Sequence, residues 1–536
     1  MNWDKLLVKH YDKVKTNLGI DLDVSQIIDL TKETSNGETL STEFLFDDTL
    51  TNLGIKLRNS SVNEIQEITH QIFEKIAEAN NKKKDFGEVF TKISGWDSSI
   101  RKAFRKNPAP FLSMNSKFCE VSYGLGNCIK PTVEVLMETL RSKAAVMYGT
   151  GKKANKLSDD ELRTHILDNM IYGVELQEQF APLTIYFLDP KNQSKKLHKH
   201  LYQGNSLLFD YIFDGESMMG KFDVVYGNPP YGVLNTDESS TYAYSSEQWA
   251  NTKESKALHT YFIRLASDLL KHGGLMLYVT RASVLVTDNT RSFREEILKK
   301  QFDVNLVWIP QKDTLYSGAQ TTGMFLMATK KDELDARTPT TFIRFIHNVE
   351  YECEYTIKDT DEKIPMLWDE RSIAIWEYCS SLSNRFKTSK GIVRAGNLVD
   401  DGDFTLLDAI GTDGPNFKKT NFNKESKRTK DGISRTDTKV LVSTGCTDAL
   451  GERLNWLEGL VKDENGEFEY TANVCGIANV TSLDHIESIL TDPVIKVYGS
   501  LIRTDRNTSS AFYKMMSYDY DQTQLNEEVI KWAKEL

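Results

Sequence analysis

Five short apolar runs, each closed by a polar turn, dominate the middle of the chain and limit the folds open to it. They are MIYGVEL (170–176), FDVVYGNPP (222–230), GLMLYVT (274–280), FDVNLVWIP (302–310) and TGMFLMATK (322–330). Amphipathic stretches separate them, such as LHTYFIRLASDLLKHGG, which we expect Gly273 and Gly274 to end as a helix. This alternation predicts a mainly parallel, doubly wound α/β sheet, in which ligands lie beyond the carboxyl ends of the strands.

The segments on either side of these runs have a different texture. Residues 1–85 carry apolar side chains at helical spacing and end in a basic run, which predicts a helical N-terminal segment. After residue 335 the strand-helix alternation weakens. We therefore expect three parts: a helical segment 1–85, an α/β domain 86–335 and a further domain 336–536.

Composition narrows the class of protein. The chain has 536 residues, with 66 Lys and Arg against 77 Asp and Glu, and a formal net charge of −11. It contains no run of about 18 uncharged apolar residues and no apolar leader, so we expect a cytoplasmic protein without a membrane span. The six cysteines lack the spacing of a disulfide framework or a zinc site, so we expect reduced thiols and no metal.

One basic segment stands out in this acidic chain. Residues 415–440 carry eight Lys and Arg against three Asp and Glu, a local charge of +5. Phe417 and Phe422 are interleaved with these cations, and Arg385 and Arg503 belong to flanking basic clusters. The pattern fits either a solvated face or a nucleic-acid surface. In the second interpretation the DNA contacts include Lys418, Lys419, Lys427 and Arg428.

The sharpest chemical feature is Asn228-Pro229-Pro230-Tyr231, directly after the apolar run that begins at residue 222. Two prolines can neither continue a sheet ladder nor enter a helix interior, so a rigid loop is expected at the carboxyl end of a strand. The loop offers a side-chain amide, a backbone carbonyl and an aromatic ring. An ordinary proline turn is the alternative, and the neighbouring motifs decide against it.

A planar exocyclic amine matches this loop. The amine of adenine is a poor nucleophile because its lone pair is delocalised into the ring. If Asn228 Oδ1 and the Pro229 carbonyl accept its two hydrogens, the lone pair becomes localised on nitrogen, and Tyr231 can stack on the base. This chemistry needs no covalent intermediate and therefore no nucleophilic Cys or Ser.

Polar groups follow three other strand-like runs. FCEVSYGLGN (118–127) offers Glu120, which suits a positively charged part of a ligand, and glycines that let a ligand approach the backbone. Glu175 ends the run MIYGVEL and suits a ribose diol, although a carboxylate that starts a helix is the alternative. HLYQGNSLLF places Asn205 and Ser206 after a further short strand, where a polar side chain can meet an adenine amine.

Taken in order, these motifs resemble the catalytic domain of DNA adenine-N6 methyltransferases of the gamma arrangement. In that family the cofactor motifs come first, the catalytic loop next and the target-recognition domain last. NPPY matches the catalytic loop residue for residue, GEVFT (87–91) is similar to the motif that precedes the glycine turn, and TTGMFLMATKK resembles a motif of the target-base pocket. The resemblance covers roughly residues 86–335.

The resemblance implies a Rossmann-like class I methyltransferase domain, S-adenosylmethionine as the cofactor and double-stranded DNA as a partner. It implies that Tyr231 and Phe325 stack on the target base. The residues that it places on the cofactor are Phe90, Thr91, Glu120, Gly124, Gly126, Asn127, Glu175, Asn205, Ser206 and Asn228.

The chain departs from the family's pattern at several positions. Lys92 and Arg281 stand where the family usually has proline, and Asn205 replaces an Asp. The stretch from the glycine turn to Glu175 is also long, and Gly149 and Gly151 form a rival turn within it. That rival has no acid at a preceding strand end and lacks the spacing of a phosphate loop, so we assign the cofactor turn to 120–127 and expect an inserted loop at 148–160.

The implied activity is methyl transfer to N6 of an adenine that is flipped out of the duplex, with residues 336–536 as the target-recognition domain. The loop alone leaves other acceptors open, namely RNA or a protein glutamine amide. The chain would also fit the modification part of a restriction-modification enzyme with an endonuclease partner. A catalytically silent DNA-binding protein would keep the fold without the chemistry.

Overall fold

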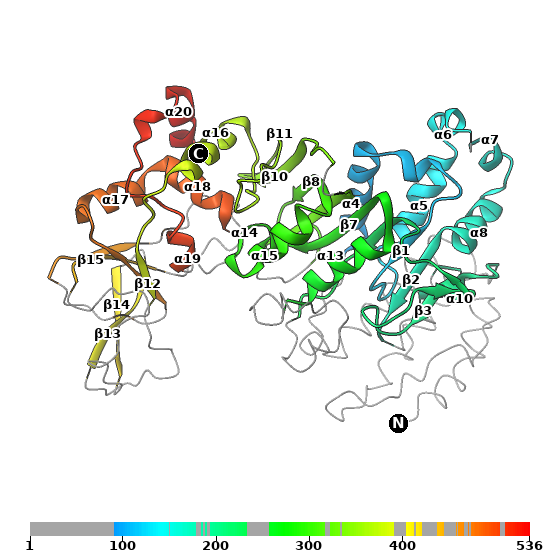
Figure 1. Cartoon of the computed structure of the whole chain (residues 1–536), viewed down its shortest axis with the longest axis horizontal. Helices are drawn as coiled ribbons and strands as arrows, with labels where there is room; N and C mark the ends of the chain where they lie inside the picture. Colours follow the sequence, from blue (N-terminus) through cyan, green and yellow to red (C-terminus); the bar gives the residue numbers. More distant parts are fainter. Residues whose placement is uncertain are drawn as a thin grey trace, which may run out of the picture.

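The computed structural model describes residues 91–149, 151–177, 184–185, 188–189, 193–232, 257–316, 322–332, 335–390, 404–411, 414–420, 437–443, 457, 459–465, 470, 473–503 and 510–536. The helices expected in residues 1–85 lie outside this part of the chain. The described molecule is elongated, with a large sheet toward one end and a smaller antiparallel sheet toward the other (Figure 1).

The large sheet has nine strands. In order across the sheet they are β11 (Val349–Tyr355), β10 (Thr340–Ile346), β8 (Phe302–Ile309), β9 (Gly323–Lys330), β7 (Leu270–Arg281), β6 (Phe222–Gly227), β1 (Phe118–Glu120), β2 (Ile171–Glu175) and β3 (Leu201–Gln203). The strands β9 and β11 run antiparallel to their neighbours, and the other pairs are parallel. All five strands expected from the apolar runs are confirmed.

Helices cover both faces of this sheet, as a doubly wound fold requires. On one face lie α4 (Ile93–Lys106), α5 (Ile129–Leu140) and α8 (Asp159–Asn169), and on the other lie α13 (Leu258–Leu269), α14 (Ser283–Val286) and α15 (Arg291–Phe293). Within β7, Leu277 and Val279 pack into the core on the α4, α5 and α8 side. Met276 and Tyr278 pack into the core on the α13, α14 and α15 side. Both faces are buried, which explains why these strands read as continuous apolar runs.

The expected end of α13 was wrong. The helix ends at Leu269, and Gly273 and Gly274 lie inside β7, which begins at Leu270. The pairing of β7 with β6 shifts register between Phe222 and Val224, and Gly273 has a φ of +75°. The glycines therefore lie at an irregularity in the β6–β7 pairing, where a residue without Cβ can adopt positive φ.

The inserted loop expected at residues 148–160 contains a short helix, Gly151–Ala154, and the start of α8. The helices α5, α6 (Lys143–Met147), α7 (Gly151–Ala154) and α8 fill the interval between β1 and β2. Ser158 caps α8, and its side chain and that of Glu161 bond each other's backbone N–H groups. This capping box explains why a charged stretch with weak apolar periodicity forms a helix.

The C-terminal part contains a four-stranded antiparallel sheet of order β12-β17-β15-β16 and a separate hairpin, β13-β14. Its strands are β12 (Thr388–Lys390), β13 (Phe404–Gly411), β14 (Gly414–Thr420), β15 (Lys439–Ser443), β16 (Leu460–Asp463) and β17 (Val474–Ala478). Its helices are α16 (Glu370–Ser381), α17 (Leu483–Thr491), α18 (Pro493–Ile502), α19 (Ser510–Tyr513) and α20 (Glu527–Glu535). The shorter elements elsewhere are α10 (Leu197–His200), β4 (Ile212–Phe213), β5 (Glu216–Ser217) and a 3-10 turn, Ala109–Leu112.

The large sheet continues past residue 335 through β10 and β11, so the expected division into domains at that residue remains a prediction. Among the described residues, no helix combines the length and apolar character needed to cross a bilayer. The five cysteines in this part of the chain are free and buried.

A buried arginine joins the large sheet to the C-terminal helices. Arg344 on β10 is buried, and its Nη1 donates hydrogen bonds to the carbonyls of Met366 (2.9 Å) and Ser500 (3.0 Å). Its guanidinium also lies 4.9 Å from the ring centre of Trp368. Because Ser500 belongs to α18, one side chain satisfies carbonyls on both sides of this junction.

We expect Arg344→Met to lower the free energy of unfolding by about 3 kcal/mol, because it leaves two buried carbonyls without a donor. Urea unfolding followed by tryptophan fluorescence measures the change. Arg291→Met is the control: Arg291 is exposed and pairs with Glu362, so its loss should cost about 0.5 kcal/mol or less. Equal stabilities for the two variants would contradict the role of Arg344.

Candidate functional site

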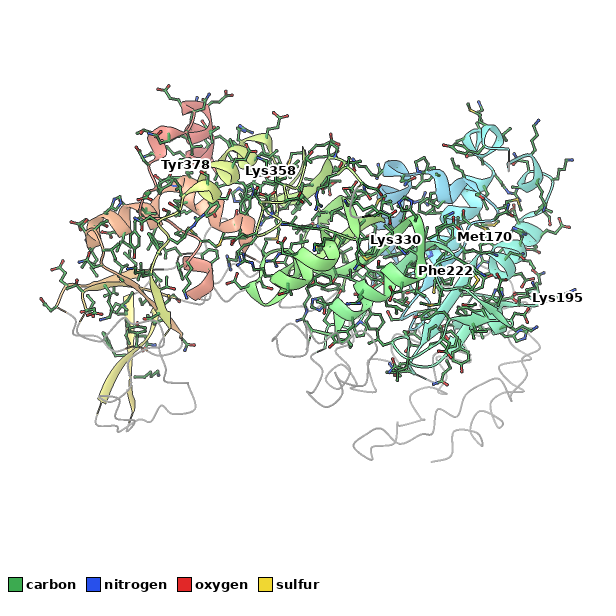
Figure 2. The ribbon with its side chains drawn as sticks, viewed as in Figure 1. Met170, Lys195, Phe222, Lys330, Lys358 and Tyr378 are labelled. Carbon is green, nitrogen blue, oxygen red and sulfur yellow. The ribbon has the colours of Figure 1, made fainter. Side chains whose placement is uncertain are left out.

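The site lies where the strand order reverses direction. From β1 the chain passes outward to β2 and β3, then returns to place β6 on the other side of β1. In Figure 2, Met170 and Phe222 mark the amino ends of β2 and β6, and Lys330 marks the end of the antiparallel β9 at the same edge. The opposite edge holds the carboxyl ends of β1, β2 and β6, where a ligand of a doubly wound sheet lies.

The pairing register brings the predicted motifs together at that edge. Glu120 at the end of β1 pairs with Tyr226 on one side and with Gly173 on the other. Gly227 follows Tyr226, with a φ of +133°, and a Cβ at this position would lie 3.0 Å from Glu120 Cγ. A glycine is therefore required between the strand and Asn228, since any side chain would press on Glu120.

The loop Asn228-Pro229-Pro230-Tyr231 is held by its own side chains. The carbonyl of Asn228 accepts a hydrogen bond from Ser122 Oγ at 3.3 Å. Tyr231 is 4% exposed, and its hydroxyl donates to Asn228 Oδ1 and lies 3.3 Å from the carbonyl oxygen of Val279. In this structure a hydroxyl donor thus occupies the amide oxygen that we predicted to accept an amine hydrogen.

The glycine turn of residues 120–127 lies against Glu175. Gly124 and Gly126 have φ values of +50° and +78°. The Gly124 N–H donates to Glu175 Oε2 at 2.8 Å, and the Gln177 N–H donates to Glu175 Oε1 at 2.9 Å. Of the rival pair, Gly149 follows α6 and Gly151 is the first residue of α7.

Glu175 therefore has a structural task in addition to the predicted contact with a ribose. Both of its oxygens accept backbone hydrogen bonds, which hold the turn after β1 beside the end of β2. Burial raises its pKa, and the backbone N–H groups oppose that shift. Leu176 follows directly and is 48% exposed. An exposed apolar side chain beside a predicted nucleoside contact suits the face of a purine ring, and our sequence analysis did not assign it.

Besides the Thr91 hydroxyl, two buried oxygens, one carboxylate and one amide, have no hydrogen-bond partner among the described residues near this edge. They are Glu120 Oε2 and Asn127 Oδ1. Asn127 is oriented by the Thr91 carbonyl, which accepts from its Nδ2 at 2.8 Å. Burial, reinforced by the charge of Glu175, raises the pKa of Glu120 well above its usual value, with the Cys128 thiol acting in the opposite direction. A cationic ligand would satisfy both acceptors, so this set fits the sulfonium and ammonium groups of S-adenosylmethionine.

The remaining predicted cofactor residues lie at the same edge, after β3. Asn205 Oδ1 accepts from the Leu207 N–H at 3.0 Å, which closes a local turn. Ser206 is buried, and its hydroxyl donates to the Val121 carbonyl after β1. The structure thus ties the ends of β1 and β3 together, while Phe90 lies outside the described residues.

The other predicted residues are buried in the core, exposed on the hairpin or outside the described chain. Phe325 is 0% exposed in the middle of β9, edge-on to Trp96 with ring centres 5.9 Å apart, so it packs in the core here. Lys418 is exposed on β14 of the hairpin. Lys419 belongs to the same strand, its side chain lies outside the described part, and so do Lys427 and Arg428.

Two cations of the flanking basic clusters are not free surface charges. The guanidinium of Arg385 donates to the carbonyls of Cys379 (3.0 Å), Ser380 (2.7 Å) and Met515. Arg503 is buried. These side chains are therefore poorly placed to neutralise phosphates. The composition of the basic clusters alone does not reveal this.

A group that could bind a metal lies at the opposite edge of the sheet. His272, Asp332 and Asp335 are exposed, and His272 Nε2 is 3.0 Å from Asp335 Oδ2. Exposed acidic groups of this kind are common without an ion, and no second feature marks a ligand there. The trio does not contribute to the site.

Three residues around Tyr231 were missed as site residues. Arg281 Cζ lies 5.1 Å from the centre of the Tyr231 ring, and the rings of His259 and Tyr316 lie 6.4 and 6.1 Å from it. Arg281 ends β7, and polar residues at strand ends are the ones expected to contact a ligand. In the sequence, however, it stood out only because the resembling family usually has proline there. His259 opens α13, and its spacing predicts nothing more than a helix.

Comparison with known proteins identifies the kind of fold. Residues 138–312 match the model of the family described as Eco57I restriction-modification methylase. No curated protein sequence matches the chain significantly.

Several solved structures are similar to this chain. MmeI, a Type IIL restriction-modification enzyme in complex with DNA, is matched with a TM-score of 0.55 and 12% identity over 91% of this chain and 75% of that chain. A DrdV–DNA complex is matched at 0.53 and 10% identity, over 99% and 66%. LlaBIII, an ATP-dependent Type ISP restriction-modification enzyme bound to DNA, is matched at 0.52 and 12%, over 99% and 45%. The chain spans only part of each of these longer proteins, and at such identities the likeness shows the fold alone, a doubly wound α/β fold extended by a C-terminal part.

The raised pKa of Glu120 makes a prediction for ligand binding. A cation beside the carboxyl lowers its pKa, so S-adenosylmethionine should release protons on binding, and its affinity should rise with pH until the free carboxyl is ionised. Calorimetry in two buffers of different ionisation enthalpy counts the protons. In Glu120→Gln the affinity should be weaker and independent of pH over the same range; an unchanged proton release in that variant would contradict this account.

Proposed function

We propose that this protein transfers a methyl group from S-adenosylmethionine to N6 of a flipped-out adenine in double-stranded DNA. The observation that carries the proposal is the position of Asn228-Pro229-Pro230-Tyr231, at the point where the strand order reverses and next to Glu120. The match of residues 138–312 to a restriction-modification methylase model supports it.

The loop acts by positioning and by accepting hydrogen bonds. The cofactor supplies the methyl group on a positively charged sulfur, which makes that carbon electrophilic. Asn228 Oδ1 and the Pro229 carbonyl accept the two amine hydrogens and so concentrate the lone pair on N6. An amine hydrogen replaces the Tyr231 hydroxyl on Asn228 Oδ1, and release of that hydroxyl frees the ring to reorient toward the base.

The buried acceptors hold the cofactor end of the reaction. Glu120 and Asn127 present oxygen atoms that lack hydrogen bonds within the described chain, and the turn at Gly124 brings the backbone close. Leu176 covers one face of the cofactor's purine. Exclusion of water from this edge strengthens each of these contacts, because the local dielectric is low.

The duplex is bound by the C-terminal part. Flipping a base costs a few kcal/mol of unstacking, and phosphate contacts offset that cost. The β13-β14 hairpin carries exposed Lys418 and lies toward the far end of the molecule from β3 (Figure 1). The DNA complexes of MmeI, DrdV and LlaBIII support DNA rather than RNA or a protein amide as the acceptor.

The acceptor is identified by offering S-adenosylmethionine with a labelled methyl group to separate DNA, RNA and protein pools. We expect label in DNA and, after digestion to nucleosides, in N6-methyladenine. Long-read sequencing of DNA from cells that express the protein then locates the modified sequence. Label confined to protein or RNA would reject the proposal.

Asn228→Ala should lower kcat at least about a hundredfold, because one of the two acceptors of the amine is lost. Cofactor affinity, measured by calorimetry, should change by less than about threefold, since the contact is made chiefly in the transition state. Asn115→Ala, an exposed asparagine before β1, is the matched control. Full activity in Asn228→Ala would refute the role given to the loop.

Lys418→Glu should weaken DNA binding and reduce the slope of log K against log salt by about 1, as expected for one lost phosphate contact. Fluorescence anisotropy across a salt series measures that slope. Lys531→Glu makes the same charge change on exposed α20 and should leave the slope unchanged. The same slope in Lys418→Glu and wild type would show that the hairpin does not contact phosphates.

A further inference from the structure

A second set of polar groups with buried atoms lies around the Tyr231 ring. His259 comes from the first turn of α13, and Arg281 ends β7. Tyr231 lies near both: the His259 ring is edge-on to it, and the Arg281 guanidinium faces its ring. The first turn of α13 and the carboxyl end of the strand that follows it, β7, which pairs with β6, therefore converge on the catalytic loop.

These groups lack the hydrogen bonds that burial normally demands. His259 is 5% exposed, and neither of its ring nitrogens has a partner among the described residues. Arg281 Nε is buried and is also without a partner there. A buried polar group without a partner costs on the order of 1–3 kcal/mol, and cases in native proteins often mark a functional site. Two such groups beside the proposed reaction centre point to a polar ligand.

The charge state of His259 determines what it can donate. Burial, together with the nearby charge of Arg281, lowers its pKa to about 4. Tyr231 is the other titratable group against it, and its pKa is raised by burial, so it stays neutral. Near pH 7 the His259 ring is therefore neutral, with one N–H donor and one acceptor.

Adenine makes a specific demand on such a site. Its exocyclic N6 is flanked by two ring nitrogens, N1 and N7, and both are acceptors without hydrogen. The exocyclic amine of cytosine is flanked by one ring nitrogen and one C–H. A site that accepts both amine hydrogens and also presents a donor on each side of the amine is complementary to adenine and leaves a donor unsatisfied against cytosine.

We infer that His259 and Arg281 are specificity-determining residues of the target-base site, where the neutral His259 N–H and the Arg281 Nε–H donate to N1 and N7 of the target adenine, one to each. The inference rests on the proposed function and deepens it. Asn228 and Pro229 would read the amine, while His259 and Arg281 read the atoms on either side of it. The Tyr231 hydroxyl bonds Asn228, and the Tyr231 ring lies beside His259 and Arg281. A reorientation of this ring would therefore move it from one pair of residues toward the other.

The test compares three duplexes that differ by one atom in the target base. Once the modified sequence is known, they carry adenine, 1-deazaadenine or 7-deazaadenine at the methylated position. For the wild type we expect kcat/KM to fall about tenfold to a hundredfold with each analogue, because each leaves one donor unsatisfied. This measurement needs no variant, so it stands even if a substituted protein is unstable.

The variants assign the two contacts. His259→Phe and Arg281→Met remove one donor each, and each should lose about as much activity on adenine as the wild type loses on the corresponding analogue. In each variant that analogue should cost nothing further, whereas the other analogue should keep its full effect. His259→Gln, which restores an N–H donor, should recover part of the activity of His259→Phe.

Matched controls separate these effects from general destabilisation. His200→Phe replaces another buried histidine whose pKa burial lowers to about 4, at the amino edge of β3. Arg291→Met removes an exposed arginine. Both should leave the discrimination between adenine and the two analogues unchanged, and thermal melting checks that every variant folds.

Each outcome bears on one claim. If the wild type methylates all three bases equally, or if the losses from variant and analogue multiply, His259 and Arg281 do not read N1 and N7, although the proposed function stands. A loss in Arg281→Met that is independent of both analogues assigns Arg281 to a phosphate and also overturns the inference. If no DNA adenine is methylated, the proposed function and the inference fail together.

Discussion

The parallel pairing of β1 with β6 is the constraint on which the rest of the site depends. It pairs Glu120 with Tyr226, so that Gly227, the next residue, lies against the Glu120 side chain and Asn228 follows directly. A side chain at residue 227 would press on that carboxyl group, and a shift of one residue would turn Glu120 toward the opposite face of the sheet. The distance between the cofactor acceptors and the amine acceptors is therefore set by backbone hydrogen bonds, which are much stiffer than side-chain contacts.

Buried polar groups give this edge its chemical character. Within the described part of the chain, Glu120 and Asn127 keep acceptors without partners near the end of β1, and His259 and Arg281 keep donors without partners beside Tyr231. Each costs stability in the absence of a ligand, so a ligand that satisfies them recovers that free energy on binding. The signs differ as well: the acceptor side suits a cation, and the donor side suits a neutral base rich in ring nitrogens.

Much of the fold follows from local pattern, because buried parallel strands leave a clear apolar signature. Each of the five runs forms a strand, and the motifs at 120–127, 175, 205–206 and 228–231 meet at one edge. The pattern failed at two places, one decided by strand pairing and one by a local helix cap. Gly273 and Gly274 read as a helix stop, yet they serve the register shift of β7 against β6. The residues 148–160 lack apolar periodicity, yet Ser158 and Glu161 start a helix there.

The site residues also fall into two groups: those recognisable from local sequence and those defined by contacts between elements. Asn228 and Glu120 are recognisable because their position after a strand determines their role. Arg385 looked like part of a basic surface, but its guanidinium is committed to three backbone carbonyls. His259 is the converse case: nothing in its helix distinguishes it from a core residue, and only the approach of β7 and the loop after β6 gives it a polar neighbourhood. Contacts between elements that are distant in sequence cannot be derived from periodicity, which reports a single element at a time.

The net negative charge of the chain is compatible with its proposed affinity for DNA, because the acidic side chains and the basic side chains proposed to contact DNA lie in different parts of the molecule. Acidic side chains on β11 pair with lysines of α4, as Glu350 and Glu354 do with Lys102 and Lys106. Such pairs remove negative charge from the field that a duplex would meet at short range, since an ion pair is nearly neutral beyond a Debye length of about 8–10 Å. The hairpin with Lys418 lies toward the other end of the molecule from β3 (Figure 1). A duplex that reaches both the hairpin and the loop at Asn228 would therefore be steered by local charge, and the rigidity of the Arg344 junction would determine how accurately binding at one end places a base at the other.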